Sequence, residues 1–344
     1  LRRRLLPKRP PIFGSGSWGT ALAIGLVEKG HEVTLWARRQ EAAKAMRENR
    51  HNPDYLPDVR LPEGLNITHN LGNTAREKEM WVIATPSHSI RALATSLKPF
   101  AHKKLIVVSV AKGIENGTLL TTSQVLSDVL IPLVPKSHIG VLYGPSHAEE
   151  VILGMPTTVV AAAGSRTAAQ EIQHTFMSKK LRIYVNPDLL GVEISGSVKN
   201  VMAIAAGISD GVGYGDNTKA AILTRGMAEI RRLGLAMGAK PETFSGLAGI
   251  GDLVVTCMSQ HSRNRFVGEQ IGRGRSLEEI QAEMNMVAEG VRTTQSVMEL
   301  ARKLHVEMPI TEAVHSLLFE GKKPQEVVMH LMTRAAKNEL DWLG

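Results

Sequence analysis

The sequence has one cysteine, Cys257, and few aromatic residues, which make up 4% of its 344 residues. A single cysteine can form neither an intrachain disulfide nor a metal site with several thiolates, and this fits a reducing compartment. No histidine pair has a metal-binding spacing such as His-Glu-x-x-His, and Cys257 has no evident catalytic histidine partner. We therefore expect a cytoplasmic protein with no metal and no thiol-based reaction.

The chain also lacks a long apolar run. Its most apolar stretch, residues 190–208, is interrupted by Glu193 and Lys199, so no membrane span and no stable membrane insertion are expected. Hydrophobic residues make up 43% and charged residues 22% of the chain, which excludes wholesale disorder. The length favours two domains of roughly 150 residues each.

Positive charge is in excess. The 41 Lys and Arg against 33 Asp and Glu give a net charge of +8, which favours anionic partners such as phosphorylated metabolites or nucleotides. Part of this excess lies in residues 1–9, which we interpret as a solvated tail; a transit-peptide remnant and a nucleic-acid-binding arm are the alternatives. Because interleaved basic and aromatic residues are sparse, we expect no nucleic-acid partner.

The hydrophobic pattern changes near the middle of the chain. Up to residue 186, short β-branched runs alternate with amphipathic stretches, as in βαβ units whose sheet is buried on both faces. Beyond it the pattern is helical, and Pro187 suits the first turn of a helix over residues 187–208. We predict an α/β Rossmann-type doubly wound domain in residues 10–186 and an all-α domain in residues 187–344, with a cleft between them. The expected strands are 12–13, 32–36, 81–84, 105–108, 157–161 and 181–185, with a further parallel strand that ends just before Gly144.

Gly14, Gly16 and Gly19 follow a short apolar run and precede a good helix. In this context they form a dinucleotide-binding fingerprint: a tight turn, a close backbone approach to pyrophosphate, and close helix packing. An ordinary Gly-rich loop is the alternative. Pro10 and Pro11 cannot donate to a sheet ladder, so the first strand is expected to be short.

The second expected strand is followed by Arg38 and Arg39, where an NAD-selective fold carries an acidic ribose ligand. Either arginine could stack on adenine and neutralise a 2′-phosphate. This favours NADP(H), with NAD(H) possible. In the alternative, the arginines are solvated and Glu41 contacts the ribose.

Two lysines are candidates for chemistry. Lys112 follows an expected strand, at the sheet edge where ligands bind, so it could meet an anion or polarise a carbonyl; a surface lysine is the alternative. Lys199 lies in an apolar helix, where a lysine is costly to bury unless it is paired. Buried lysines can move protons near pH 7, whereas the alternative is a lysine whose ammonium reaches solvent.

Dense glycines at residues 246–251 predict a loop whose backbone faces a ligand. Asp252, directly after it, is a candidate partner for a catalytic cation, while Arg263 and Asn264 could hold a phosphate. A structural Asp–Arg pair that caps helix ends is the alternative.

Together these motifs resemble the bacterial type of NAD(P)-dependent glycerol-3-phosphate dehydrogenases over residues 14 to about 318. Departures from the family pattern are Pro10–Pro11 and Ala111, where threonine is common. The segments that carry the resemblance are 14–23, 112–113, 144–146, 196–200, 207–211, 223–226, 249–252, 262–265 and 287–290.

The resemblance implies reversible NAD(P)H-dependent reduction of dihydroxyacetone phosphate to sn-glycerol 3-phosphate, the backbone for glycerophospholipid synthesis, by a homodimer. It implies that Lys199 accepts and donates the proton, with Lys112 and Asp252 as the other catalytic residues. The expected substrate site comprises Lys112, Gly144, Ser146, Lys199, Asn200, Asp252, Ser262, Arg263 and Asn264. The expected cofactor site comprises Gly14, Gly16, Ser17, Trp18, Gly19, Arg38, Arg39, Lys112, Ala148, Arg263, Val287 and Glu289.

Two other functions stay open. Another Rossmann reductase, acting on small hydroxyacids or imines, would share the fingerprint and a helix lysine, but it has little need for Asp252 together with Arg263. A nonenzymatic dinucleotide-binding protein would explain the fingerprint and the net charge, but not a buried lysine.

Overall fold

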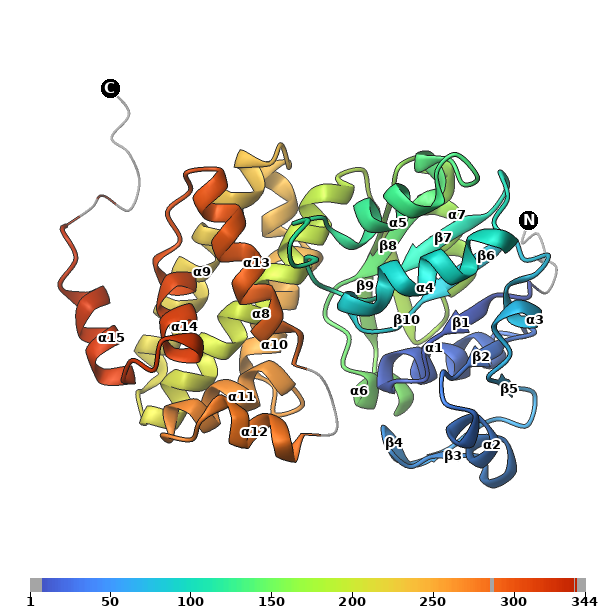
Figure 1. The fold of residues 1–344 in the computed structure, drawn as a ribbon, viewed down its shortest axis with the longest axis horizontal. Coiled ribbons are helices and arrows are strands. Elements are labelled where there is room, and N and C mark those ends of the chain that lie inside the picture. Colours follow the sequence, from blue (N-terminus) through green and yellow to red (C-terminus); the bar gives the residue numbers. More distant parts are fainter. Residues whose placement is uncertain (1–7, 285–287, 337, 339–344) are drawn as a thin grey trace.

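The first half of the chain folds around a mixed sheet of eight strands (Figure 1). The computed structural model describes residues 8–284, 288–336 and 338. The strand order is β10-β9-β8-β7-β6-β1-β2-β5, and only the β8–β9 pair is antiparallel. The strands are β1 (Pro11–Phe13), β2 (Thr34–Trp36), β5 (Asn66–Thr68), β6 (Met80–Ile83), β7 (Ile106–Ser109), β8 (Ile139–Tyr143), β9 (Thr157–Ala163) and β10 (Leu181–Asn186), with β3 (His51–Asn52) and β4 (Leu56–Arg60) in a separate hairpin.

Helices cover both faces of the sheet. Residues of α1 and α7 share one apolar core with one face, and residues of α4 and α5 share another core with the opposite face. The Rossmann-type doubly wound architecture is thereby confirmed. The helices of this half are α1 (Ser17–Glu28), α2 (Gln40–Asn49), α3 (Leu71–Ala75), α4 (Ile90–Leu97), α5 (Thr122–Leu130), α6 (Ala148–Ile152) and α7 (Arg166–Phe176).

The first strand is as short as its prolines predict. β1 spans three buried residues and lies between β2 and β6, with Pro11 at its first position, where a proline does least harm to a ladder. The expected strands omit β5 and the β3–β4 hairpin. Only Ile67 is buried in β5, and the hairpin is largely exposed, so neither carries the apolar run on which the prediction relied.

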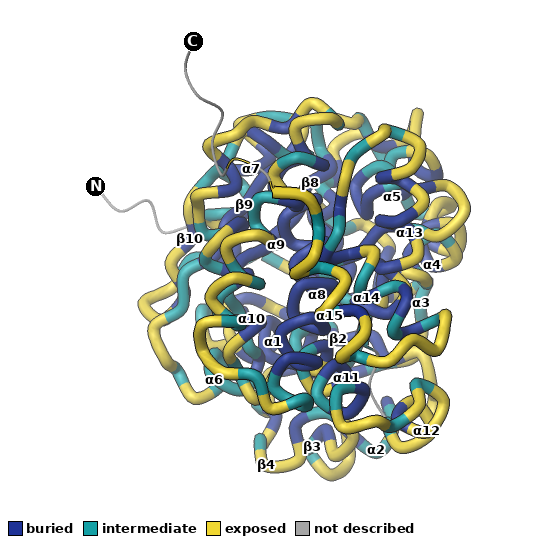
Figure 2. The backbone as a smooth tube through the Cα atoms, turned by 90° about the vertical axis from the view of Figure 1, so that its left-hand side faces the viewer, coloured by how far each residue is buried: buried dark blue, intermediate teal, exposed yellow. Residues whose placement is uncertain are grey.

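The second half is helical, as predicted, and α8 is its core. Nineteen of the 24 residues of α8 are buried, and α8 appears as a dark tube through the centre of Figure 2. By length and composition α8 could cross a membrane, but 89% of its most apolar window is buried inside the protein, as in a core helix. The helices are α8 (Leu189–Val212), α9 (Asp216–Ala236), α10 (Asp252–Met258), α11 (Arg263–Gly272), α12 (Leu277–Glu283), α13 (Glu289–Lys303), α14 (Pro309–Phe319) and α15 (Pro324–Met332).

The expected start of α8 at Pro187 is wrong. Asp188 is the N-cap, because its Oδ1 accepts a hydrogen bond from Gly191 N at 3.0 Å, and Pro187 precedes the helix. Asp188 Oδ2 also accepts from Lys240 N and from Thr243 Oγ1, so this carboxylate joins α8 to the segment after α9.

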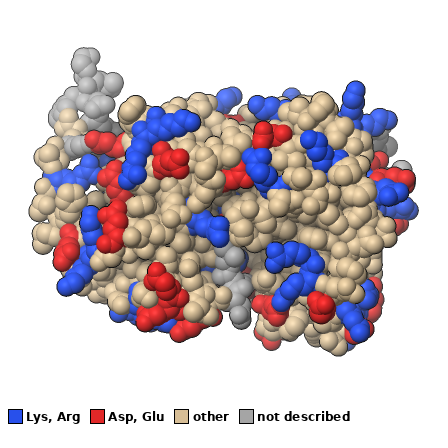
Figure 3. All heavy atoms as spheres, viewed as in Figure 1, with Lys and Arg blue, Asp and Glu red and all other residues tan. Residues whose placement is uncertain are grey.

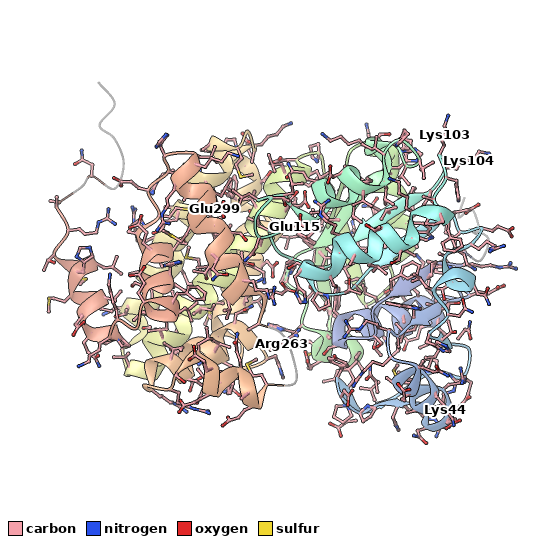
Figure 4. All side chains as sticks on the ribbon, viewed as in Figure 1. Lys44, Lys103, Lys104, Glu115, Arg263 and Glu299 are labelled. Carbon is pink, nitrogen blue, oxygen red and sulfur yellow. The ribbon has the colours of Figure 1, made fainter. Side chains whose placement is uncertain are left out.

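A segment of the sheet domain that follows β7 packs against the helical domain. In this bridging segment, residues 110–121, Ile114 and Leu119 belong to the apolar core of the helical domain. Ser296 Oγ on α13 donates to Ile114 O at 3.0 Å. Figure 4 labels Glu115, which lies in this segment beside the helical domain. The position of Lys112 is therefore set by both domains.

Candidate active site

A cavity of about 1190 Å³ is lined by both domains. The segments that follow β1, β2, β6 and β7 contribute one wall, and residues of α8, α10 and α11 contribute the other. Among the predicted site residues, the cavity brings together Gly14, Gly16, Ser17, Trp18, Gly19, Arg38, Arg39, Lys112, Ser146, Lys199, Asn200, Asp252, Ser262, Arg263, Asn264 and Glu289. Gly144 and Ala148 do not line it, and Val287 lies outside the described residues.

The glycine fingerprint forms one end of the cavity. Gly14 has φ +123°, and a Cβ there would lie 2.6 Å from the Ala84 carbonyl carbon, so only glycine fits this turn. A Cβ on Gly16 would meet no atom within 4 Å, and Gly16 lines the cavity. The first turn of α1 has no side-chain cap and no acidic residue. Its N–H groups and helix dipole therefore suit a pyrophosphate, and this end of the cavity fits a dinucleotide.

The two arginines after β2 differ in their contacts. Both are exposed and line the cavity, but an Arg39 guanidinium nitrogen lies 2.6 Å from Asp54 Oδ2. Arg38 is the better placed of the two to contact a cofactor, because Arg39 is engaged by that carboxylate. Glu41 lines the same end of the cavity, so the alternative ribose contact remains open.

Asp252 joins the two predicted lysines. Its Oδ1 lies 2.8 Å from Lys199 Nζ and its Oδ2 lies 2.6 Å from Lys112 Nζ. The side chains of Asp252, Lys199 and Lys112 are 1%, 6% and 17% exposed, so neither lysine extends its ammonium freely into solvent. Lys112 also donates to Gly144 O at 3.0 Å, so Gly144 contacts a residue of the cavity without lining it.

The pKa of Lys112 lies close to neutral pH. Burial lowers the pKa of Lys112 to about 8; the Asp252 carboxylate raises it and the neighbouring Lys199 lowers it. A lysine with this pKa is mostly protonated at pH 7 and becomes mostly neutral above about pH 8. Lys112 can therefore supply positive charge to an oxygen in the cavity at neutral pH.

Thr256 is a site residue that the sequence analysis missed. It lies one helical turn after Asp252 on α10, accepts a hydrogen bond from Lys199 Nζ, and donates to Asp252 O at 2.6 Å. The signal was available, because residues i and i+4 share a helix face. The neighbouring Cys257 does not line the cavity. It is fully buried, and burial raises the pKa of its thiol to about 12.

Glu289 connects the domains at the cavity edge. At the start of α13, it accepts hydrogen bonds from Ser87 N at 2.9 Å and from Ser87 Oγ at 2.5 Å. Ser87 follows β6 in the sheet domain. The sequence analysis did not assign Ser87, because its partner lies 202 residues away.

The start of α11 contributes polar groups to the helical wall. Ser262 caps this helix by accepting from Arg265 N, and Asn264 Oδ1 accepts from Gly290 N at 2.8 Å. Figure 4 labels Arg263 at the side of the helical domain that faces the sheet domain. Because Asp252 binds two lysines, the alternative of a structural Asp–Arg cap is wrong for Asp252.

The expectation that the glycines at residues 246–251 expose backbone to a ligand is wrong for the large cavity. None of these glycines lines it, and a Cβ on Gly249 would lie 2.1 Å from Phe244 O. Gly249 allows the tight turn Leu247–Gly251 to pack closely against Phe244, and this turn leads directly into Asp252 at the start of α10.

Comparison with known proteins agrees with this geometry. Family models described as NAD-dependent glycerol-3-phosphate dehydrogenase N-terminus and C-terminus match residues 11–169 and 188–329. A glycerol-3-phosphate dehydrogenase (NAD(P)+) of Salinibacter ruber is 60% identical and the alignment covers 96% of both chains; one of Chlorobium luteolum is 52% identical over 96% of this chain and 99% of the relative. The crystal structure of glycerol-3-phosphate dehydrogenase from Coxiella burnetii has a TM-score of 0.91 and 38% identity, covering 95% of this chain and 99% of that chain.

Proposed function

This chain belongs to the NAD-dependent glycerol-3-phosphate dehydrogenase family, and on that premise we propose that it reversibly reduces dihydroxyacetone phosphate to sn-glycerol 3-phosphate with NAD(P)H. The observation that carries this proposal is the Lys112–Asp252–Lys199 cluster, which lies in the same cavity as the glycine fingerprint. When bound, the cofactor supplies the hydride. The cluster supplies what a ketone reduction also needs, a positive charge and a proton for the developing alkoxide.

In this proposal Lys199 is the general acid, and in the reverse direction the general base. Asp252 and Thr256 both contact its ammonium group, so its N–H groups keep a defined direction. Lys112 adds a second positive charge from the sheet domain. Two lysines and one carboxylate leave the charged cluster with a net positive charge, which suits an oxygen that gains negative charge during the reaction.

The proposed phosphate subsite lies on the helical wall. Arg263 offers a planar guanidinium fork, and Asn200, Ser262 and Asn264 line the same cavity. Ser146 lines it from the sheet domain. Holding the phosphate away from the reacting carbon would orient the ketone and reduce the entropic cost of reaction.

We propose a preference for NADPH over NADH. Support comes from Arg38, which is exposed and lines the fingerprint end of the cavity, where a 2′-phosphate would add negative charge. Glu41 in the same wall is the residue that would favour NADH instead. Glu289 and Trp18 line the rest of the proposed cofactor site, whereas Ala148 follows a lining residue, His147, and does not line the cavity itself.

One assay tests the reaction. Oxidation of NADPH and of NADH is followed with dihydroxyacetone phosphate, pyruvate, ketopantoate or no substrate. We expect turnover only with dihydroxyacetone phosphate. Turnover with the unphosphorylated ketoacids would favour a general Rossmann reductase, and cofactor binding without turnover of any substrate would favour a nonenzymatic dinucleotide-binding protein.

The wider setting is also a proposal. We propose a cytoplasmic homodimer without a metal, in which residues 10–186 hold the cofactor, residues 187–344 carry the catalytic lysine, and the product supplies glycerophospholipid synthesis. On the face drawn in Figure 3, basic and acidic side chains are interspersed, which gives no support to a nucleic-acid partner. Sedimentation velocity at micromolar concentration tests the homodimer, and a monomer at that concentration would contradict it.

A further inference from the structure

Tyr143, the last residue of β8, contacts the Lys112 region in two ways, and its neighbour Gly144 adds a third contact. Its hydroxyl donates to Ala111 O, which belongs to the peptide group directly before Lys112. Its ring centroid lies 5.7 Å from Lys112 Nζ, within the range of a cation–π contact. The next residue, Gly144, accepts from Lys112 Nζ. One tyrosine therefore contacts both the backbone and the ammonium group of this lysine.

The ring of Tyr143 is held against the helix that carries Lys199. A Cβ on Gly196 of α8 would lie 2.7 Å from Tyr143 Cδ2, so the absence of a side chain there allows the close approach. Gly196 precedes Lys199 by less than one helical turn. Tyr143, which is fully buried, thus contacts Lys112 and packs against α8 within one helical turn of Lys199.

The hydroxyl of Tyr143 continues into a buried polar network. It lies 3.0 Å from Thr122 Oγ1, which is 3.0 Å from Glu193 Oε1. Glu193 also accepts from Thr121 Oγ1, Ser123 N and Ser123 Oγ at the start of α5. Since Glu193 is part of α8 and is only 1% exposed, it fixes the first turn of α5 to the core of the helical domain.

The two ends of this network have defined donors. Thr122 Oγ1 donates to Glu193 Oε1, and the Tyr143 hydroxyl donates to Ala111 O. Burial raises the pKa of Glu193, whereas the hydrogen bonds that it accepts from Ser123, Thr121 and Thr122 lower it.

We propose that Glu193, Thr122 and Tyr143 are positioning residues that hold the peptide before Lys112, so that the Lys112 ammonium meets Asp252 and the reacting oxygen from a fixed direction. This inference rests on the proposed reductase function, in which Lys112 stabilises the developing alkoxide. None of the three residues lines the cavity, so they act on the reaction through Lys112.

The test compares hydroxyl-deleting variants with matched controls. Tyr143→Phe keeps the ring and removes the hydroxyl, and Thr122→Val keeps the shape of threonine. We expect each to lower kcat/KM for dihydroxyacetone phosphate about tenfold through kcat, because small misplacements of catalytic groups are costly, with the Kd for NADPH within threefold of wild type. Thr122→Ser, which keeps a hydroxyl, and Tyr184→Phe, at an exposed tyrosine of β10, should stay within twofold of wild type.

A second measurement needs no substrate. Acetic anhydride labelling of Lys112 at several pH values, read by peptide mass spectrometry, gives the pKa of Lys112 in each folded variant. We expect it to rise from about 8 toward its ordinary value of 10.5 in Tyr143→Phe and Thr122→Val, because a loosened lysine gains water. An unchanged labelling profile, or equal losses in Thr122→Ser and Thr122→Val, would overturn the proposal. Absence of wild-type turnover would instead overturn the proposed function, and the labelling would still decide the positioning role.

Discussion

Asp252 binds Lys112 and Lys199 through different oxygens, at 2.6 Å and 2.8 Å, and the two lysines come from different domains. The carboxylate thus compensates two ammonium groups that burial would otherwise make costly. Removing it leaves two neighbouring cations without their shared counter-charge, whereas removing one lysine leaves a paired Asp252. The three residues should therefore respond differently to substitution.

Asp252→Asn should lower kcat/KM for dihydroxyacetone phosphate by at least 10²-fold, and it should also change the pH profile. Asp252 raises the pKa of Lys112, which is about 8, so its loss should move this pKa downward. The cationic form of Lys112 would then disappear at a lower pH, and the alkaline decline of activity should begin earlier. Measured pH profiles of kcat/KM that overlay after scaling would contradict this role.

Lys199→Ala should lower turnover by at least 10²-fold, the usual scale for a general acid–base group. Cofactor affinity, measured by fluorescence, should stay within a few fold of wild type. Lys219→Ala is the matched control, since Lys219 pairs with Asp210 at 2.6 Å and does not line the cavity. Near-normal turnover of Lys199→Ala would remove Lys199 from the mechanism.

Much of the sheet was predictable because strands that are buried on both faces have short runs of β-branched residues in the sequence, and these runs differ from the periodicity of helices. The exceptions have a physical reason: β5 buries one residue, and the β3–β4 hairpin buries few. The start of α8 was misplaced because proline preferences for the first turn compete with a capping aspartate, and Asp188 takes the cap.

In the site, sequence spacing located single residues better than their partners. Asp252 was expected to pair with a catalytic cation, but the division of its two oxygens between two lysines is a property of the folded chain. Glu193 was visible as an acid in an apolar helix. Its partners lie some 70 residues earlier, at the start of another helix, so no local pattern indicates them.

Arg263→Lys should raise the KM for dihydroxyacetone phosphate at least tenfold. A guanidinium can hold a phosphate through two parallel hydrogen bonds, whereas an ammonium acts as a point charge. Arg265→Lys is a control on the same helix, because Arg265 pairs with Asp210 and does not line the cavity. If Arg263→Lys changes only thermal stability, Arg263 is a structural residue.

Glu229 should make the stability of the helical domain depend on pH. This buried carboxyl accepts hydrogen bonds from Ile310 N and Thr311 N in the first turn of α14, and burial raises its pKa from 4.5 to about 7. Because the folded state then binds more protons between these two values, the free energy of unfolding should fall as pH rises through them, by about 3 kcal/mol. Urea unfolding at pH 5 and pH 8 should show a smaller fall for Glu229→Gln. Equal falls in both proteins would mean that Glu229 titrates alike in the folded and unfolded states.

Cofactor preference tests the two arginines that follow β2. A 2′-phosphate paired with Arg38 would gain a charge-assisted hydrogen bond worth roughly 1.5 to 3 kcal/mol, or about ten- to a hundredfold in kcat/KM. Arg38→Ala should reduce the ratio of kcat/KM for NADPH over NADH by that factor. Arg39→Ala should change it less, because Arg39 is already paired with Asp54. Since Arg38 is exposed, the wild-type preference should also shrink in high salt, where counterions screen the pair. Equal ratios in wild type and Arg38→Ala would show that Arg38 faces solvent and that Glu41 or the backbone binds the ribose.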